Sequence, residues 1–312
     1  MEAVVAVILL NWNGINDTAD CVASLLKSTY PAVAIYVVDN ASGNNEAATL
    51  ATQFPGINVL AQKENLGFCA GNNVGISKAI QDGAAYIIVL NNDTLVPPEA
   101  IEIMLAGFKK LPAAGAISPA ILEHPATEKV WFSKAVWQPE KAQFRLSLPQ
   151  DRYDELKIKE PYLTDFTCGC CLLSSAEVMN KVGLLDERYF AYYDEAEWCK
   201  RLEKNGYQSY VVPQSFIYHK VSRSVVGLVS TYLLTRNRLL WMKENLSFSQ
   251  RMQSFFYLRK EFYWHLLNSW GIVKGEYSKA HSKAFLQGYK DYRNGLFGRW
   301  NEKTEKIIFQ KK

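Results

Sequence analysis

Residues 3–14 read Ala-Val-Val-Ala-Val-Ile-Leu-Leu-Asn-Trp-Asn-Gly, eight apolar residues followed at once by a polar turn. A short, unbroken apolar run that ends in Asn and Gly predicts a strand covered on both faces. The run is far shorter than the roughly 18–20 apolar residues that cross a bilayer, and Glu2 precedes it in place of a basic residue. We therefore expect a core strand here, and neither a secretory signal nor a transmembrane helix in the chain.

The same kind of pattern continues along the first 120 residues. Apolar strands are expected at 33–39, 57–60 and 85–90, and helices at 17–28 (capped by Asn16 or Asp17), 44–53 and 70–81. Strands that alternate with helices predict an α/β fold with a parallel sheet, and the near-continuous apolar strands predict helices on both of its faces. Because ligands lie beyond the carboxyl ends of such strands, we expect the polar clusters at 11–14, 39–42 and 91–93 to meet in one crevice.

The balance of charge changes sign near residue 219. Residues 1–219 hold 17 Lys and Arg against 25 Asp and Glu, whereas residues 220–312 hold 18 against 6. We expect two domains with this boundary, the second helical, with long helices at 231–245 and 250–270. Aromatic residues at helical spacing among basic ones predict docking on an anionic membrane surface, or packing on the first domain or a second subunit. No recognition motif for nucleic acid accompanies the charge.

The six cysteines do not have the spacing of a metal site. Cys168, Cys170 and Cys171 form a cluster, but it lacks the paired C-x-x-C spacing that is typical of zinc ligands. We expect small residues of the core or the cleft wall, in a reducing cytoplasm without disulfides.

Two carboxylates follow expected strands. Asp93, beside the amides of Asn91 and Asn92, suits a hard divalent cation that bridges a diphosphate, or it caps the helix expected at Pro97. Asp39 can accept the imide N–H of uracil or thymine, or it forms an Asp-Asn turn. Each site therefore has a functional and a structural interpretation.

Three glycines surround the start of the helix expected at 70–81. Gly67, Gly71 and Gly75 would let the backbone approach a ligand, and a helix N-terminus favours anions. Their spacing is not that of a dinucleotide fingerprint. His219, after a strand-like segment that ends at Pro213, is either a metal ligand or a structural histidine.

Three acids open a further expected helix, in the stretch Tyr-Tyr-Asp-Glu-Ala-Glu-Trp-Cys-Lys-Arg at 192–201. Asp194, Glu195 and Glu197 are well placed to complement a helix dipole, which is a purely structural role. Alternatively, one of these carboxylates is positioned against a sugar hydroxyl as a general base.

Eight short motifs occur in a fixed order, at 7–14, 37–42, 64–68, 90–94, 183–190, 194–197, 218–219 and 236–238. Together they resemble the family 2 glycosyltransferases of the GT-A fold, particularly the bacterial rhamnosyltransferase-like branch. This resemblance implies an α/β fold with a Rossmann-like, mixed but mainly parallel sheet flanked by helices and a helical C-terminal extension. The resemblance covers roughly residues 1–240. It implies transfer of a sugar, with rhamnose favoured, from a dTDP- or UDP-sugar to a saccharide or lipid-linked saccharide, with inversion, in surface polysaccharide biosynthesis.

The resemblance also implies a donor site. Asp39 would read the pyrimidine base, and Mg²⁺ or Mn²⁺ would bind Asp93 and His219, although Asn91 stands at the first position of the D-x-D motif. The residues implied around the nucleotide are Asn11, Asn13, Asp39, Asn65, Gly67, Asn92 and Asp93, and those implied at the diphosphate are Arg223, Arg236 and Arg238. A cation and arginines would stabilise the charge of the leaving diphosphate.

On the acceptor side, the family usually writes the acid pair as Glu-Asp, and this chain reads Asp-Glu. By position Glu195 is the implied base, with Asp194 as the other candidate. Tyr193, Glu197 and Trp198 are implied beside the acceptor.

Two other functions are compatible with a similar fold. A sugar nucleotidylyltransferase would need a Gly-rich loop with Arg or Lys after the first strand, and residues 11–14 do not supply one. A catalytically inactive nucleotide-sugar-binding subunit would not need the acids at 93 and 194–197. We therefore expect a cytoplasmic enzyme, peripheral on the inner face of the membrane, that also has the means to form a homo-oligomer.

Overall fold

The computed structural model describes residues 2–125, 128–146, 152–153, 160–220, 227–275 and 277–309. The chain divides into two compact units. Unit 1 comprises Met1–Val136, Leu146–Leu185 and Trp198–Ser222, and unit 2 comprises Trp137–Arg145, Asp186–Glu197 and Arg223–Lys312. The division therefore differs from a single cut at residue 219, because two internal segments belong with the C-terminal residues.

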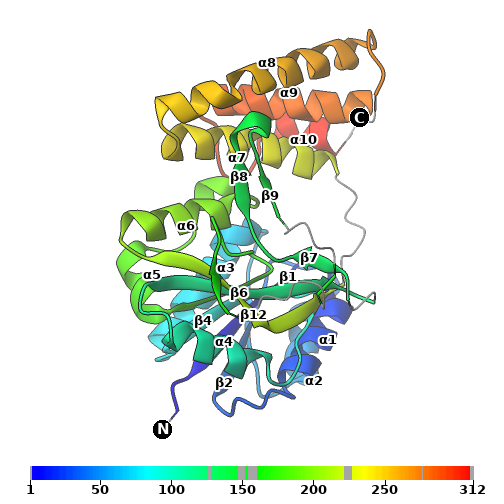
Figure 1. The fold of residues 1–312 in the computed structure, drawn as a ribbon. Helices are drawn as coiled ribbons and strands as arrows, with labels where there is room; N and C mark the ends of the chain where they lie inside the picture. The colour runs from blue at the N-terminus through cyan, green and yellow to red at the C-terminus, as the bar shows by residue number, and fades with distance from the viewer. Residues whose placement is uncertain are drawn as a thin grey trace. The chain divides into compact units, whose positions relative to one another are not determined.

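Unit 1 is built around one sheet (Figure 1). Its strands follow the order β10-β12-β6-β11-β4-β1-β2-β3. The strands are β1 Val5–Asn11, β2 Val33–Asp39, β3 Asn58–Ala61, β4 Tyr86–Asn91, β5 Thr94–Leu95, β6 Ala114–Glu123, β7 Val130–Phe132, β10 Tyr162–Leu163, β11 Cys171–Ser175 and β12 Gln208–His219. β1 to β4 run parallel, as do β6 and β12, while β11 is antiparallel between β4 and β6. This confirms the predicted α/β class with a mainly parallel sheet.

One expected strand end is wrong. β12 continues through Pro213 to His219, and its pairing with β6 is irregular between Val212 and Phe216. The irregularity accommodates a proline, which cannot donate a hydrogen bond to the ladder. The longer strand carries His219 to the same end of the sheet as the strand β5.

The helices of unit 1 are α1 Ile15–Leu25, α2 Glu46–Gln53, α3 Gly67–Gln81, α4 Ala100–Lys109 and α5 Ala176–Val182, and the boundary between the units falls inside α6, Asp194–Lys204. Helix α1 begins after Gly14 without a side-chain cap, so the expected cap by Asn16 or Asp17 is wrong.

Two of the three predicted ligand-site glycines instead allow α3 to lie against β1. A Cβ atom on Gly71 would stand 2.5 Å from Leu10 Cδ1, and one on Gly75 would stand 2.5 Å from Ile8 Cγ2. Gly67, with φ of +84°, occupies the left-handed region at the start of the helix. Gly71 and Gly75 therefore serve close packing of α3 on the sheet.

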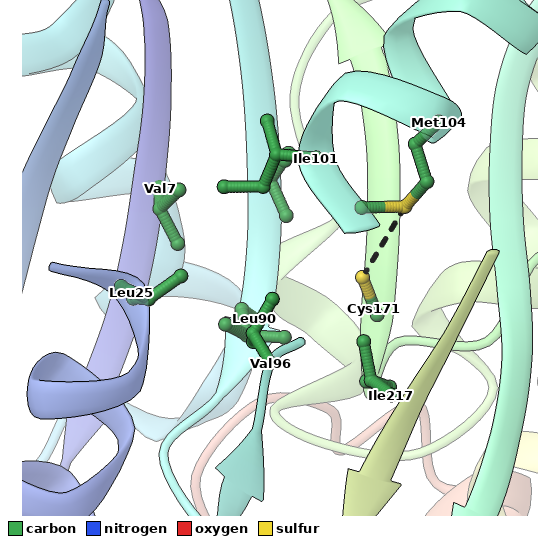
Figure 2. Close-up of a pocket in the computed structure, with 9 residues that line it drawn as sticks. Val7, Leu25, Leu90, Val96, Ile101, Met104, Cys171 and Ile217 are labelled. Atoms are coloured by element: carbon green, nitrogen blue, oxygen red, sulfur yellow. Dashed lines mark hydrogen bonds between the residues drawn. The ribbon is translucent and has the colours of Figure 1, made fainter. Parts of the chain in front are cut away.

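Apolar side chains fill the space among β1, β4, β11, β12, α1 and α4, as Figure 2 shows. Cys171 Sγ lies 3.9 Å from Met104 Sδ in this cluster. All six cysteines are buried and none is in a disulfide. Burial raises the pKa of the Cys21 thiol to about 12, which favours the protonated form. These thiols are core residues.

Unit 2 contains a hairpin and a helical group (Figure 1). Its elements are β8 Val136–Gln138 (whose first residue belongs to unit 1), η1 Pro139–Lys141, β9 Gln143–Arg145, η2 Glu187–Tyr189, α7 Leu228–Asn245, α8 Phe248–Trp270, α9 Lys279–Arg293 and α10 Glu302–Ile308. Helix α9 contacts α7, α8 and α10. Within the part of the chain that the structure describes, none of the helices combines the length and apolarity required to cross a membrane.

Candidate active site

The carboxyl ends of β1 and β2 hold a buried amide against two carboxylates. Asn11 and Asp39 are register partners and are 0% and 4% exposed. Asn11 Nδ2 donates to Asp39 Oδ1 at 2.8 Å and to Glu46 Oε2 at 2.9 Å. Asp39 Oδ2 also accepts from the backbone N–H of Ser42 at 3.1 Å. Because a carboxylate has about four lone-pair sites, Asp39 retains capacity to accept a hydrogen bond from a ligand.

Glu46 also belongs to this site, although the sequence pattern does not predict it. It opens α2 and is 7% exposed, although an acid in the first turn of a helix is ordinarily explained by the helix dipole. The signal that could have found it is the pair Asn44-Asn45, both with positive φ. Asparagine tolerates this conformation, and the resulting turn brings the start of α2 back to the end of β1.

A hydroxyl relay joins the ends of β1 and β4. Asn92 Nδ2 donates to Thr18 Oγ1 at 2.8 Å, and the Thr18 hydroxyl in turn donates to Asn11 Oδ1 at 2.7 Å. Thr18 is fully buried on α1. The predicted convergence of the polar clusters that follow β1, β2 and β4 is therefore present, and Thr18 is the link that sequence spacing does not reveal.

The turn after β1 is fixed by the loop after β2. Asn13, with φ of +53°, donates its backbone N–H to Ser42 Oγ at 2.9 Å, and its Oδ1 accepts from the Gly43 N–H at 2.8 Å. Trp12 is left 55% exposed by this arrangement. The turn therefore presents a large aromatic face at the edge of the site.

Asn65 and Gly67 are held by a residue outside the predicted set. Asn40 Nδ2 donates to Asn65 Oδ1 at 3.0 Å and to the Gly67 carbonyl at 3.2 Å, and Asn40 Oδ1 accepts from the Leu66 N–H at 2.9 Å. Asn65 Oδ1 also accepts from the Gly67 N–H at 2.8 Å. Asn40 thus secures the start of α3 beside the end of β2.

Asp93 and His219 meet at the end of the sheet where β5 pairs with β12. Asp93 Oδ1 lies 3.1 Å from His219 Nε2, and the two side chains are 18% and 9% exposed. The ring of Trp131 packs edgewise on the His219 ring, with centroids 4.6 Å apart. Asp93 does not cap a helix, because α4 begins only at Ala100, with Glu99 as its N-cap residue.

The acid cluster at 194–197 opens α6 within unit 2. Asp194 is 2% exposed, and burial, followed by the neighbouring charge of Glu195, raises its pKa well above the usual range of a carboxyl. Glu195 is only partly buried. Burial therefore favours the protonated form of Asp194, while Glu195 is the more accessible member of the pair, and two carboxyl groups in different environments suit acid–base chemistry.

The sequence of unit 1 identifies its family directly. A protein-family model described as Glycosyl transferase family 2 matches residues 6–183, more than half of the chain. The chain belongs to glycosyltransferase family 2. The matched segment contains all of the site that surrounds Asn11 and Asp39, at the ends of β1, β2 and β4.

Curated relatives include two rhamnosyltransferases. An N-acetylglucosaminyl-diphospho-decaprenol L-rhamnosyltransferase of Mycobacterium tuberculosis is 25% identical over 229 residues, which cover 65% of this chain and 71% of the relative. The dTDP-rhamnosyl transferase RfbF of Shigella flexneri is 23% identical over 282 residues, 86% of this chain and 89% of the relative. The second match extends well beyond the segment of the family model.

Solved structures share the fold at low sequence identity. GalNAc-T7 with UDP, GalNAc and Mn²⁺ aligns with a TM-score of 0.61 and 14% identity over 99% of this chain, which spans 56% of that one. The mannosyltransferase PcManGT from Pyrobaculum calidifontis, in complex with GDP-Man and Mn²⁺, aligns with a TM-score of 0.55 and 16% identity, covering 99% and 86%. These likenesses establish the GT-A type of fold for this glycosyltransferase.

Asp93 and His219 are the candidate ligands for a divalent cation in this glycosyltransferase. Among the residues that the structure describes, no group of three or more His, Cys, Asp and Glu side chains is placed to hold a metal. Asp93 Oδ1 and His219 Nε2 nevertheless lie 3.1 Å apart as an ion pair, and a carboxylate suits Mg²⁺ or Mn²⁺ while imidazole is a ligand of transition metals. Such an ion commonly takes its other ligands from phosphates and water.

The arginines predicted at the diphosphate have other partners. Arg236 is fully buried, and its Nη1 donates to the Gly298 carbonyl at 2.7 Å. Arg238 is 8% exposed and its Nη2 lies 2.5 Å from Glu261 Oε2. Arg223 lies outside the described residues. The contacts of the first two are those of structural cations, so the diphosphate role expected from the sequence is corrected for both.

On the predicted acceptor side, Trp198 is a core residue. It is 1% exposed, and its indole N–H donates to the Gly183 carbonyl at 2.7 Å, which leaves no face for a sugar. Glu197 is 6% exposed. Tyr193 is partly exposed and lies near Phe144, with ring centroids 6.0 Å apart. Of the three, Tyr193 is the side chain with an accessible surface.

Proposed function

We propose that this family 2 glycosyltransferase transfers a rhamnosyl group from dTDP-rhamnose to a hydroxyl of a saccharide or lipid-linked saccharide, with inversion, in the synthesis of a surface polysaccharide. The rhamnosyltransferases among its relatives support the donor, and the lipid-linked substrate in the name of one of them supports the acceptor class. The observation that carries the proposal is the buried Asn11–Asp39–Glu46 network, which prepares an acceptor of hydrogen bonds at the ligand-binding edge of the sheet.

On the donor side, Asp39 accepts the imide N–H of the pyrimidine base. Asn11 and the Ser42 N–H hold its carboxylate in place, so the group does not have to be ordered when the nucleotide arrives. Asn13 and Asn65, with Gly67, line the nucleoside. A divalent cation held by Asp93 and His219, next to Asn92, would neutralise the diphosphate as negative charge develops on it.

On the acceptor side, Glu195 removes the proton from the acceptor hydroxyl. The hydroxyl oxygen forms a bond to the anomeric carbon while the bond from that carbon to the diphosphate oxygen breaks, and the nucleoside diphosphate leaves with the electron pair. A single displacement of this kind inverts the anomeric centre. Asp194 retains its own proton, since its pKa is raised, and so it serves Glu195 as a neutral neighbour.

The test is a turnover assay of the full chain with Mg²⁺ or Mn²⁺, offered dTDP-rhamnose and a panel of UDP-sugars with saccharide and lipid-linked acceptors. Glu195→Gln keeps the size of the side chain and removes the base, so we expect nucleoside diphosphate release to fall about 10²–10⁴-fold. Glu187→Gln, the same change at an exposed position of the same segment, is the matched control and should retain activity. Full activity of Glu195→Gln would refute this assignment of the base.

Donor binding is measured on the same samples to separate the remaining functions. Binding of dTDP-rhamnose without turnover of any acceptor would indicate an inactive binding subunit. The match to a glycosyltransferase family speaks against that outcome. Absence of binding by every pyrimidine nucleotide would overturn the donor site. Loss of turnover on chelation, restored by Mn²⁺, is expected if Asp93 and His219 hold a catalytic cation.

We also propose that α8 docks this enzyme on an anionic membrane. Exposed apolar and aromatic side chains, between 42% and 76% exposed, recur along α8 at spacings that place them on one face: Phe248, Met252, Phe255, Phe256, Tyr263 and Trp270. Exposed Arg251, Arg259 and Lys260 lie among them. Arginine and lysine beside an aromatic face is the composition of an interfacial helix, and the positive charge selects anionic lipid.

The opposite face of α8 is polar and turned inward, which is the reverse of an ordinary surface helix. Ser254 donates to the Pro139 carbonyl at 2.7 Å, and Asn268 Nδ2 donates to Ser282 Oγ at 2.8 Å. His265 is buried, and its Nδ1 lies 2.9 Å from the same hydroxyl. Since the polar groups of α8 are satisfied within unit 2, its aromatic face is the one left for an external partner.

Sedimentation with vesicles tests the docking. Phe255→Ser combined with Phe256→Ser should weaken binding to phosphatidylglycerol vesicles at least tenfold, because each Phe contributes about 1.5–3 kcal/mol when fully buried. Leu296→Ser, at a 45% exposed position elsewhere in unit 2, is the matched control. Equal binding by both variants, or a dimer in solution that the double substitution dissociates, would overturn the membrane assignment; the dimer would show that a second copy covers this face.

A further inference from the structure

The segment that leads into the acid pair has an unusual backbone. Phe190, Tyr192 and Tyr193 have φ of +64°, +68° and +67°, in the left-handed region that residues with a side chain rarely adopt. Three such residues stand within four positions, directly before Asp194. A backbone of this kind persists only where its surroundings hold it, and it is often found where geometry matters for function.

Asn237 holds this backbone from helix α7. Its side chain is fully buried, and Nδ2 lies 2.8, 2.7 and 2.9 Å from the carbonyl oxygens of Tyr189, Ala191 and Tyr192. Its Oδ1 accepts from Arg236 Nε at 3.0 Å, which fixes the orientation of the amide. One amide group thus donates to three carbonyls of the loop, all of them within unit 2.

Arg236 completes the contact. Nη2 donates to the carbonyls of Tyr189 at 3.1 Å and of Arg188 at 3.3 Å, while Nη1 donates to the Gly298 carbonyl at 2.7 Å. A fully buried guanidinium with such partners gains charge-assisted hydrogen bonds and has no vacant face for a phosphate. Nη2 is therefore committed to the backbone that leads into the loop, while Nη1 and Nε are committed to Gly298 and Asn237.

The helix that carries both residues is itself closely packed. A Cβ atom on Gly288 of α9 would stand 2.5 Å from the Tyr232 carbonyl and 3.3 Å from the Arg236 backbone nitrogen. Tyr232 also donates its hydroxyl to Asp291 Oδ2 at 2.8 Å. Close packing therefore holds α7 in place, and one turn of this helix supplies the N–H donors of Arg236 and Asn237 to the loop carbonyls.

We propose that Arg236 and Asn237 are positioning residues for the loop 189–193, and that they set the place of the acid pair Asp194–Glu195. The inference rests on the proposed function, in which Glu195 is the base. In this proposal the two residues do not contact the sugar donor or the acceptor saccharide. They hold backbone carbonyls of the segment directly before the first turn of α6. Displacing a base by about 1 Å is enough to cost roughly 100-fold in rate.

The experiment uses Asn237→Asp in the full chain. The change keeps the shape and replaces the donor by an acceptor facing three carbonyls. We expect kcat to fall about 100-fold, the Kd for dTDP-rhamnose to stay within a factor of two, and the acid limb of the kcat–pH profile to move. Hydrogen exchange of the amides at 189–193 should also become faster. Asn245→Asp, the same change on the same helix at a position where the amide donates to the Trp241 carbonyl of its own helix, is the matched control.

The possible results separate this inference from the proposed function. If the wild type transfers no sugar, hydrogen exchange alone decides, and equal exchange in Asn237→Asp and Asn245→Asp overturns the positioning role. If the wild type is active, a loss of rate with an unchanged pH profile, matched by an equal loss of folded protein, also overturns it. Should Asn237→Asp fail to fold, Arg236→Lys is used, with about a tenfold fall in kcat and the same movement of the pH profile expected.

Discussion

Two pairs of acids, one in each unit, have opposite surroundings. Asp39 and Glu46 in unit 1 have the amide of Asn11 between them, which donates to both at 2.8 and 2.9 Å. Asp194 and Glu195 in unit 2 are neighbours on one helix turn, and burial together with the charge of Glu195 raises the pKa of Asp194 well above its usual range. An N–H donor thus stands between Asp39 and Glu46, whereas Asp194 and Glu195 interact with each other directly.

The difference corresponds to two kinds of chemistry. A fixed N–H donor between two carboxyl groups offsets their repulsion and orients their lone pairs, which suits recognition of a ligand's N–H groups. Two carboxyl groups that interact directly move apart in proton affinity, which suits transfer of a proton. The sheet edge of unit 1 is thus prepared for binding, and the loop of unit 2 is prepared for acid–base work.

The largest expected effect comes from converting the first arrangement into the second. Asn11→Asp removes the donor and adds a third buried carboxyl group between Asp39 and Glu46. At pH 7 the free energy of unfolding should fall by about 3–5 kcal/mol, the usual cost of leaving buried charges without their partner. The loss should shrink as the pH falls toward 5, because protonation of the introduced carboxyl group relieves its repulsion with its two acidic neighbours. Urea unfolding at both pH values measures this.

Asn13→Asp is the matched control for that experiment. Asn13 Oδ1 acts as an acceptor from the Gly43 N–H, and aspartate offers the same acceptor and tolerates the same positive φ. Its free energy of unfolding should stay within about 0.5 kcal/mol of the wild type. A loss for Asn11→Asp no larger than that of Asn13→Asp, or one independent of pH, would contradict the description of unit 1.

The sequence predicts most of the first region and little of the second, for a physical reason. Apolar runs define β1, β2 and β4, and parallel strands bring their polar ends together without further information. Hence Asn11, Asp39 and Asn92 are found together as expected, with their links Thr18 and Glu46 hidden in helices where such residues are unremarkable. The positions of Asp93 and His219 follow as well, although the end of β12 was expected at Pro213.

The second region depends on contacts between distant segments that no local pattern encodes. Asn237 lies 45 to 48 residues from the carbonyls that it binds, and the motif Arg-Asn-Arg at 236–238 is equally compatible with phosphate and with backbone. Helical spacing likewise defines an aromatic face on α8 but does not say which face is buried. In both cases the polar partners, Tyr189 and Ser282 among them, decide the outcome.

A smaller effect is expected from Asp194→Asn, which replaces the carboxyl group of Asp194 by an amide that stays neutral at every pH. It tests whether the two acid pairs differ in protonation. The amide can still donate to Glu195, so kcat should remain within about tenfold of the wild type, whereas loss of 10²-fold or more would identify Asp194 as the base.

The same substitution also changes how stability depends on pH. In the wild type the unfolded chain releases the proton of Asp194 near pH 3.9, while the folded protein retains it to higher pH because the pKa of this carboxyl is raised. Stability of the wild type therefore declines relative to the variant as the pH rises above about 4, and the two coincide below it. Thermal unfolding at pH 4 and pH 7 should show Asp194→Asn more stable only at pH 7, by a few degrees, since about 1 kcal/mol shifts the Tm of a chain of this size by roughly 2–4 °C. Equal Tm values at pH 7 would mean that Asp194 is ionised in the folded protein, and the two acid pairs would then differ in their hydrogen-bond partners alone.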